Sequence, residues 1–245
     1  MRTKTKVWLI IAASLVLIGG ILFAGVMTIL RWNFMELSTV IYETNSYEIS
    51  EVFDSISINT DTADIVFAFS DDEICRVECH EEENAKHSVT VKDGTLSIEL
   101  IDNKSAYDLS RHIGLNFSTP KITVYLPKTE YTSLLIRVTT GDVYLSDINC
   151  KNLASYGTTS DMYLDNVITT ENLLIKTNTG DVMLDGCDAA EISIETSTGD
   201  VLGSLLSDKV FITEVSTGDI NVPHTTTGGV CRIKTSTGDI NITLK

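Results

Sequence analysis

The alternation of apolar and polar residues repeats itself along the chain from residue 134 onward. Each repeat is centred on Thr-Gly-Asp or a close variant, followed by Val, Ile or Met, and successive copies are 19 or 20 residues apart. On both sides of this motif the alternation has the period of two of a half-buried β-strand. We therefore predict that each repeat is a strand, a corner and a second strand. The corner positions are Gly141, Ser160, Gly180, Gly199, Gly218 and Gly238.

The residue types at the corners are those of a turn. Glycine adopts positive φ without steric cost, and Thr, Ser, Asn or Asp beside it hydrogen-bond to nearby backbone groups. A meander of hairpins and a parallel solenoid both contain such turns. The regular spacing favours the solenoid, because the corner of each rung then stacks on a corner of the same residue type in the next rung. The expected fold class is all-β: a parallel β-helix-like solenoid of 19–20-residue rungs over residues 133–245, preceded by one transmembrane helix.

Residues 51–132 are expected to form an irregular start of the same sheet system. The segment 62–65 (TADI) matches the repeat motif with Ala63 in the place of the corner glycine, and so predicts a first rung. Residues 88–100 predict a hairpin, and residues 121–126 predict a further strand. This region is therefore expected to begin the stack that the repeats continue.

The N-terminal segment is apolar, and residues 7–30 contain no charged side chain. As an α-helix with a rise of about 1.5 Å per residue, this segment is about 36 Å long, enough to cross a hydrocarbon core of about 30 Å. Trp8 and Trp32 lie at its two ends, where aromatic residues meet the membrane interface. We expect a retained transmembrane helix followed by a juxtamembrane stalk over residues 31–50. A cleaved signal peptide is the alternative.

The charges on either side of this helix predict its orientation. Residues 1–6 contain three basic side chains, whereas only Arg31 follows the helix closely. The positive-inside rule then makes residues 1–6 a cytoplasmic tail and places the C-terminal domain outside the cell membrane in a single-pass topology. Residues 31–245 carry a net charge of −19. Such a surface repels nucleic acid, so we expect no nucleic-acid partner.

One aspartate follows every corner, and stacking the corners would place these carboxylates in a column. Neighbouring carboxylates would lie about 4.8 Å apart, and Ca²⁺ prefers several oxygen ligands. Because an Asp beside a turn glycine commonly bonds to its own backbone, we expect a structural role and no cofactor, with Ca²⁺ binding as the alternative. The column consists of Asp142, Asp161, Asp181, Asp200, Asp219 and Asp239.

The chain has five cysteines and four histidines. Cys75 and Cys79 fall on one face of a strand, too far apart along it for a direct disulfide. Cys79, His80 and His87 lack the paired spacing of a zinc module, so we expect no metal site there.

The Thr-Gly-Asp-Val/Ile units, the upstream hairpin, the segment 122–127 (ITVYLP) and the N-terminal apolar segment together resemble the bacterial putative adhesin family, the β-strand-repeat domain of unknown function 4097. The resemblance covers about residues 50–245. It implies a β-solenoid at the cell envelope, in a family with members similar to proteins of envelope-stress and antibiotic-response systems in Gram-positive bacteria. It supplies no catalytic residues.

The sequence contains no nucleophile or cofactor signature that we recognise. We expect a non-enzymatic adhesin, scaffold or envelope-stress sensor that binds an envelope protein or a glycan. A β-helix enzyme acting on cell-wall glycans and a cation-binding surface protein are the alternatives. Residues 102–119 have no clear period and are the expected binding loop. The exposed column before the corners offers further binding candidates: Arg137, Tyr156, Lys176, Glu195, Glu214 and Lys234.

The alternation of Ile240, Ile242 and Leu244 predicts a last strand that ends at Lys245. We expect this strand to be an open edge through which the domain self-associates. Lys245 would blunt the edge, as charged residues on edge strands commonly do.

Overall fold

A computed structural model describes residues 3–34, 40–70, 74–101 and 118–245. The chain divides into two compact units, Met1–Ile41 with Ser105–Ser118 and Tyr42–Lys104 with Thr119–Lys245. Apart from its last two positions, the expected binding loop at residues 102–119 lies outside the described residues.

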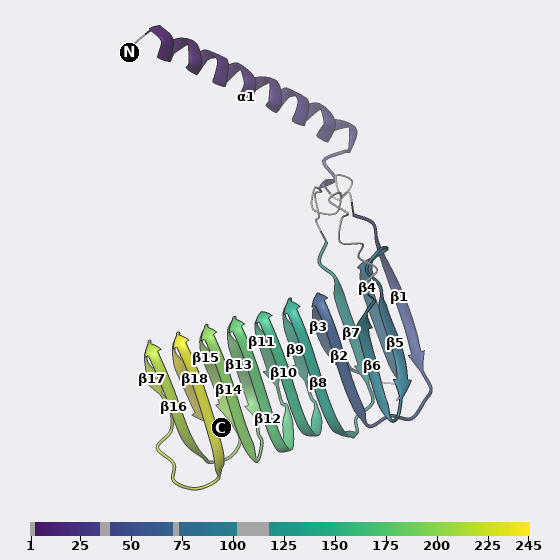
Figure 1. Cartoon of the computed structure of the whole chain (residues 1–245), viewed down its shortest axis with the longest axis vertical. Coiled ribbons are helices and arrows are strands. Elements are labelled where there is room, and N and C mark those ends of the chain that lie inside the picture. Colours follow the sequence, from purple (N-terminus) through teal and green to yellow (C-terminus); the bar gives the residue numbers. More distant parts are fainter. Residues whose placement is uncertain (1–2, 35–39, 71–73, 102–117) are drawn as a thin grey trace. The chain divides into compact units, whose positions relative to one another are not determined.

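The first unit contains the helix α1, Thr3–Ile29 (Figure 1). This helix is long and apolar enough to cross a membrane. It begins at Thr3 and so includes part of the expected cytoplasmic tail. Arg31 and Trp32 follow it with φ values of 51° and 60°. Because a right-handed helix requires negative φ, these two residues end the helix close to the predicted boundary.

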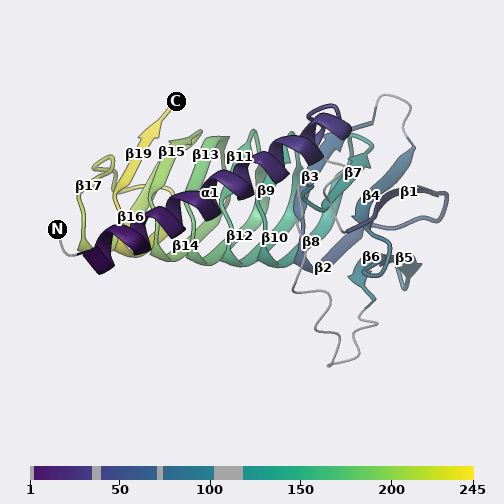
Figure 2. The ribbon, with the colours of Figure 1, turned by 90° about the horizontal axis from the view of Figure 1, so that it is seen from above.

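The second unit is a stack of strands in two sheets, shown from two directions in Figures 1 and 2. Within the described residues, sheet A has the order β1-β4-β7-β3-β9-β11-β13-β15-β19-β17 and sheet B the order β16-β18-β14-β12-β10-β8-β2-β6-β5. The strands of sheet A are β1 (Tyr42–Ile49), β3 (Asp64–Phe69), β4 (Cys75–Glu82), β7 (Lys121–Leu126), β9 (Val143–Ser146), β11 (Met162–Asp165), β13 (Val182–Cys187), β15 (Val201–Leu205), β17 (Ile220–Asn221) and β19 (Ile240–Leu244). Those of sheet B are β2 (Ser55–Thr62), β5 (His87–Lys92), β6 (Thr95–Leu100), β8 (Glu130–Thr140), β10 (Asn149–Thr159), β12 (Ile168–Thr179), β14 (Glu191–Thr198), β16 (Lys209–Thr217) and β18 (Gly229–Thr237).

From β8 to β15 the chain winds back and forth between the two sheets, and each coil adds one strand to each sheet (Figure 2). In sheet B the neighbours are parallel, with Leu153 of β10 beside both Leu134 of β8 and Leu173 of β12. The short strands of sheet A are parallel in the same way. This pairing confirms the mostly parallel, solenoid-like fold and excludes the meander of hairpins for these coils.

The core is the space between the two sheets, and the alternation of the sequence decides which side chains enter it. In the first repeat Leu134 and Ile136 of sheet B, and Val143 and Leu145 of sheet A, are all buried. Equivalent residues of the following coils continue these columns in one apolar cluster. Burying each such side chain contributes about 1.5–3 kcal/mol, and a coil obtains this only from its neighbours.

The N-terminal part of the unit begins the stack as expected. Strands β2 and β3 form the first coil, with Ala63 at its corner, and Ile56 lies beside Leu134 of the next coil. Strands β5 and β6 form the predicted antiparallel hairpin. Its turn residues Asp93 and Gly94 have φ values of 49° and 76°, the positive values that a tight hairpin turn requires.

The expected stalk at residues 31–50 is shorter than predicted. Its second half is strand β1, which pairs antiparallel with β4 at the end of sheet A. Tyr47 and Ile49 of this strand pack against the core. The sequence signal was weak because an edge strand of this kind buries little of either face, and polar residues such as Thr44 and Ser46 alternate with its few apolar ones.

The last two coils do not follow the order of the chain. Strands β18 and β19 lie between β14/β15 and β16/β17, so Ile233 has Ile194 on one side and Thr213 on the other. The expected order of successive coils is therefore wrong at this end. The expected open C-terminal edge is confined to the end of β19, since all of β19 pairs with β15 but only Ile240 and Asn241 pair with β17. The edge strands at this end are β16 in sheet B and β17 in sheet A (Figure 1).

Charge pairing on the outer face of sheet B favours this exchanged order. Lys234 of β18 lies between Glu195 of β14 and Glu214 of β16, with its ammonium 3.0 Å from the Glu214 carboxylate. In the order of the chain the two glutamates would be cross-strand neighbours, and like charges in that position are destabilising.

Candidate functional site

The outer face of sheet A carries a row of exposed or half-exposed apolar side chains. Tyr144, Tyr163, Met183 and Leu202 are cross-strand neighbours on β9, β11, β13 and β15. All four line a shallow hollow of about 360 Å³. A contiguous exposed apolar patch of this kind commonly marks a binding surface. We call these four residues the apolar stripe.

The apolar stripe is not among the sites predicted from the sequence, although a signal for it exists. Each stripe residue stands three positions after a corner glycine or Ser160, in a column that the alternation assigns to solvent. Apolar residues at this position in four consecutive repeats are unexpected for a face that is exposed to water. The last two repeats have Asn221 and Asn241 in this column, so the stripe ends at β15.

The rings of Tyr144 and Tyr163 stack on each other, with centroids 4.8 Å apart and planes within 3°. Their hydroxyl groups donate hydrogen bonds of 3.3 Å to Oδ2 of Asp142 and Asp161 respectively. Partial burial, and then the Asp142 carboxylate, raise the pKa of Tyr144 to about 12. Both phenols are therefore neutral donors near pH 7, and the aspartates fix the orientation of the rings.

The predicted column of aspartates borders the stripe on its corner side. In each neighbouring pair, Oδ1 of one aspartate accepts a hydrogen bond of 2.7–3.1 Å from the backbone N–H of the next. The ladder runs in the order Asp64, Asp142, Asp161, Asp181, Asp200, Asp239 and Asp219. One oxygen per coil thus satisfies a backbone donor at the corner of the neighbouring coil, and not the aspartate's own backbone as the turn chemistry predicted.

The corner glycines are required by the close stacking of the coils. Their φ values lie between 132° and 147° at Gly141, Gly180, Gly199, Gly218 and Gly238. A Cβ added at any of the five would lie 2.0–2.2 Å from a carbonyl oxygen of the neighbouring coil. No side chain fits at that distance, so a corner residue with this positive φ has to be glycine.

Ser160 occupies the same corner position in a different conformation. It does not have positive φ, and its side chain is buried in the core. A Cβ added at Gly157 would lie 2.7 Å from Cβ of Ser160. The inward side chain of Ser160 therefore occupies the space that Gly157 leaves empty, which explains why these two departures from the repeat occur together.

The opposite border of the apolar stripe includes Ser146, Asp165 and Asp185. Asp185 accepts a hydrogen bond of 3.0 Å from Ser204 and lies 2.5 Å from the ammonium of Lys245. The hydrogen bond from Lys245, followed by that from Ser204, lowers the pKa of Asp185. The stripe is thus an apolar strip between two rows that contain carboxylates.

The exposed column on sheet B that the sequence suggested for binding is largely paired with itself. The guanidinium of Arg137 lies 5.4 Å from the ring centroid of Tyr156, and Lys176 lies 2.9 Å from Glu195. Together with the Lys234–Glu214 pair, these contacts mean that most side chains of the column already interact with one another. The column is therefore a weaker binding candidate than the apolar stripe.

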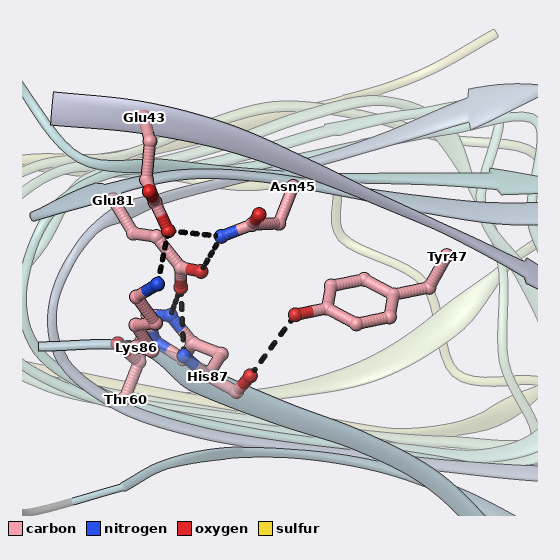
Figure 3. A network of polar contacts seen from close by, with 7 residues as sticks. All are labelled: Glu43, Asn45, Tyr47, Thr60, Glu81, Lys86 and His87. Atoms are coloured by element: carbon pink, nitrogen blue, oxygen red, sulfur yellow. Dashed lines mark hydrogen bonds and ion pairs between the residues drawn. The ribbon is translucent and has the colours of Figure 1, made fainter. Parts of the chain in front are cut away.

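A second group of polar side chains lies inside the domain, near its N-terminal end (Figure 3). Oε2 of Glu81 is 2.7 Å from both the backbone nitrogen and Nδ1 of His87. Nε2 of His87 is 2.9 Å from Oγ1 of Thr60, and Asn45 donates a hydrogen bond of 2.8 Å to the other oxygen of Glu81. Glu43 forms an ion pair with Lys86 beside this group. We call Thr60, Glu81 and His87 the buried polar cluster.

The buried polar cluster has the order hydroxyl, imidazole and carboxylate that hydrolases use for nucleophilic catalysis. Thr60 is only 5% exposed and Glu81 only 1%. A substrate cannot reach a hydroxyl inside the core, so the geometry does not support a nucleophilic role. This cluster is not predicted by the sequence, because its members lie on three different strands and match no motif.

Cys79 lies beside the buried polar cluster, whereas His80 does not. The alternation of β4 turns Cys79 and Glu81 inward, and His80 instead stacks on Tyr42 and contacts Thr44. Burial, and then the charge of Glu81, raise the pKa of Cys79 to about 12. The thiol is therefore protonated near neutral pH in the absence of a positive partner.

The two tryptophans lie at the ends of the apolar helix, as the sequence requires. Trp8 is 71% exposed on α1 and Trp32, just after the helix, is 57% exposed. Both rings are therefore largely exposed to solvent among the described residues.

The chain is thus a β-solenoid-like protein with an apolar N-terminal helix. The model of the Toastrack DUF4097 family matches residues 53–245, and the chain belongs to this family. No curated protein has a matching sequence.

Among solved structures, the chain is similar to a putative cell adhesion protein from Clostridium sporogenes, with 15% identity, a TM-score of 0.48, and coverage of 84% of this chain and 100% of that one. It is also similar to a putative adhesin from Bacteroides fragilis, with 17% identity, a TM-score of 0.49, and coverage of 83% and 97%. Both are named as adhesion proteins, and neither is named as an enzyme.

Proposed function

We propose that this protein is a membrane-anchored, non-enzymatic binding protein of the cell envelope. The helix α1 holds it in the membrane, and the repeat domain lies outside the cell. The apolar stripe binds a basic, partly apolar segment of another envelope protein. An adhesin, a scaffold and an envelope-stress sensor would each use such a contact. The observation that carries the proposal is the apolar stripe lying between the ladder of aspartates and a second border that contains Asp165 and Asp185.

The arrangement of the tyrosines favours a protein partner over a glycan. Sugar rings bind to open aromatic faces, but Tyr144 and Tyr163 cover one face of each other. Val66 and Met183 are their next neighbours in the row. Each ring therefore has at most one open face. A peptide with alternating apolar and basic side chains fits this surface, because its apolar side chains contact the stripe while its cations approach the flanking carboxylates.

A peptide of alternating leucine and lysine residues tests this binding face. We expect the full-length protein in nanodiscs to bind the fluorescently labelled peptide saturably, and the Met183→Glu variant to bind it at least about tenfold more weakly. The substitution adds a negative charge, which by itself would strengthen attraction to lysine. A loss therefore reports the apolar contact. Fluorescence anisotropy measures both affinities.

The matched control is Ile212→Glu, which makes the same charge change at an exposed apolar residue of β16 in sheet B. This variant should bind the peptide as the unmodified protein does. Equal affinities for the two variants would show that binding follows net charge alone, and the apolar stripe would lose its proposed role.

Membrane anchoring is tested separately by fractionation and protease treatment of intact cells. We expect the full-length chain, with its first thirty residues, in the membrane fraction, and the repeat domain to be digested from outside. A mature protein that lacks those residues would identify a cleaved signal, and protection of the domain would reverse the proposed topology.

A further inference from the structure

Three different metal-ligating side chains meet in the interior at the N-terminal end of the stack. Sγ of Cys79, a carboxylate oxygen of Glu81 and a ring nitrogen of His87 all lie within 4.8 Å of one another. All three residues are buried. Cys79 and Glu81 come from the inward face of β4 in sheet A, and His87 begins β5 in sheet B. The close-up in Figure 3 shows the imidazole of His87 directed at the Glu81 carboxylate.

The groups around these side chains orient them as ligands. Nε2 of His87 is 2.9 Å from the hydroxyl of Thr60, which leaves Nδ1 directed at Glu81. The amide of Asn45 holds the second oxygen of Glu81 at 2.8 Å. Partners of this kind, bonded to the far nitrogen of a histidine and to the free oxygen of a carboxylate, are what fix ligands around a protein-bound metal.

We propose that Cys79 Sγ, Glu81 Oε2 and His87 Nδ1 bind one transition-metal ion of the Zn²⁺ class. Sulfur, nitrogen and carboxylate oxygen are the ligands that zinc takes in proteins. A thiolate and a carboxylate together balance the charge of a divalent ion, so the occupied site is neutral inside the core. Three protein ligands leave a fourth tetrahedral position for water.

The change required to admit the ion is small for the Glu81–His87 pair. Ligand atoms around tetrahedral zinc lie about 3.3–3.6 Å apart, given bonds of about 2.0–2.3 Å. Nδ1 of His87 and Oε2 of Glu81, now 2.7 Å apart, therefore have to separate by about 0.6 Å. The ion displaces the thiol proton of Cys79, which passes to solvent, and the histidine proton moves from Nδ1 to Nε2, where it is donated to Thr60. Metal binding thus releases the thiol proton and weakens as the pH falls.

The position of the site points to a structural role for the ion, although structural zinc sites commonly have four protein ligands and this one has three. It links β4 of sheet A to β5 of sheet B near the end of the stack. The terminal coils of a repeat protein lack a neighbour on one side and need a separate cap. A metal that joins the two sheets at this end would serve as that cap, independently of the binding face on β9–β15.

Cobalt titration of the full-length protein in detergent tests the proposal, because a thiolate bound to Co²⁺ produces a near-ultraviolet charge-transfer band. We expect one Co²⁺ per chain, the band, and its displacement by Zn²⁺. Zn²⁺ at a hundredfold excess over its Kd should raise Tm by about 5–10 °C. The Cys79→Ser and His87→Gln variants should lose the band and the shift.

Cys75→Ser is the matched control, since Cys75 is a buried cysteine on the same face of β4. It should retain the band and the Tm shift. An unmodified protein that shows no band and no Tm shift with Zn²⁺ would overturn the proposal, and this result does not depend on how any variant folds. A band lost in Cys75→Ser but kept in Cys79→Ser would also overturn it.

Discussion

Replacing Gly199 with alanine is expected to destabilise the repeat domain by about 3–5 kcal/mol. Gly199 has a φ of 147°. A Cβ there would lie 2.0 Å from the carbonyl oxygen of Gly180 in the neighbouring coil. The side chain has no room to move, because the atom it meets is backbone. Relief requires the two coils to separate, which breaks the hydrogen bond that the N–H of Asp200 donates to Asp181. Urea unfolding of the full-length protein, monitored by circular dichroism, measures the loss of stability.

The control for this experiment is Ser160→Ala at the equivalent corner. Ser160 already has a Cβ, which lies in the space beside Gly157. Removing its hydroxyl takes away a weak hydrogen bond of 3.4 Å to the backbone of Asp161, so we expect a change below about 1 kcal/mol. If Gly199→Ala proved as stable as Ser160→Ala, the corners would not stack as closely as described.

Replacing Lys209 with methionine is expected to destabilise the domain by about 2–3 kcal/mol near neutral pH. Lys209 is buried at the start of β16, and its ammonium lies 2.5 Å from Asp188 and 2.6 Å from the hydroxyl of Ser207. It is beside Gly229 of β18 in the sheet, and Asp188 precedes β14 on the other side of that strand. The lysine side chain therefore reaches from β16 past β18 to Asp188. The variant leaves Asp188 partly buried without its cation.

The destabilisation by Lys209→Met should depend on pH. Burial by itself raises the pKa of Asp188, but the hydrogen bonds from Lys209 and Ser207 and the charge of Lys209 lower it on balance. A carboxyl with a lowered folded pKa contributes stability above its unfolded pKa of about 3.9 and loses it as the pH falls through the folded value. The difference in the free energy of unfolding between the unmodified protein and Lys209→Met should therefore shrink below about pH 4.

Lys176→Met provides the comparison for this pair. Its ammonium lies 2.9 Å from Glu195, but both side chains are about half exposed, and such pairs contribute at most about 1 kcal/mol. Urea unfolding at pH 7 and at pH 3 measures the stability of the unmodified protein, of Lys209→Met and of Lys176→Met. A Lys209→Met variant no less stable at pH 7 than Lys176→Met would contradict the role given to the buried pair.

The regular part of the fold was predictable because its signals are local and repeated. The repeats from Gly141 to Gly238 share a corner residue type, an alternation of period two and a fixed spacing. A unit with a weak pattern can therefore be assigned from the units on either side of it. The hairpin around Asp93 and Gly94 was predictable for the same reason, since positive φ at both turn residues favours this pair. Strand β1 was not, because an edge strand that is only half buried leaves a weak apolar pattern.

The two candidate sites differ in how far the sequence could predict them. The apolar stripe lies in one column of the repeat, so Tyr144, Tyr163 and Met183 are visible as a group once the repeats are aligned. Cys79 and His87 were considered together in the sequence, but Glu81 was not. The alternation of β4 and the turn before β5 bring Glu81 to them and send His80 to the other face.

The sequence by itself determined the apolar helix, the strand-corner-strand unit and the stacking of its glycines, because each depends on residues close together in the chain. Only the tertiary structure decided the order of the last two coils. Residues 216–221 and 236–241 have the same sequence, STGDIN, so no local pattern distinguishes them. Their places depend on distant contacts: Lys234 lies between Glu195 and Glu214, and Lys209 reaches Asp188 past β18. Such contacts exist only after the earlier coils have formed the surface on which the last two pack.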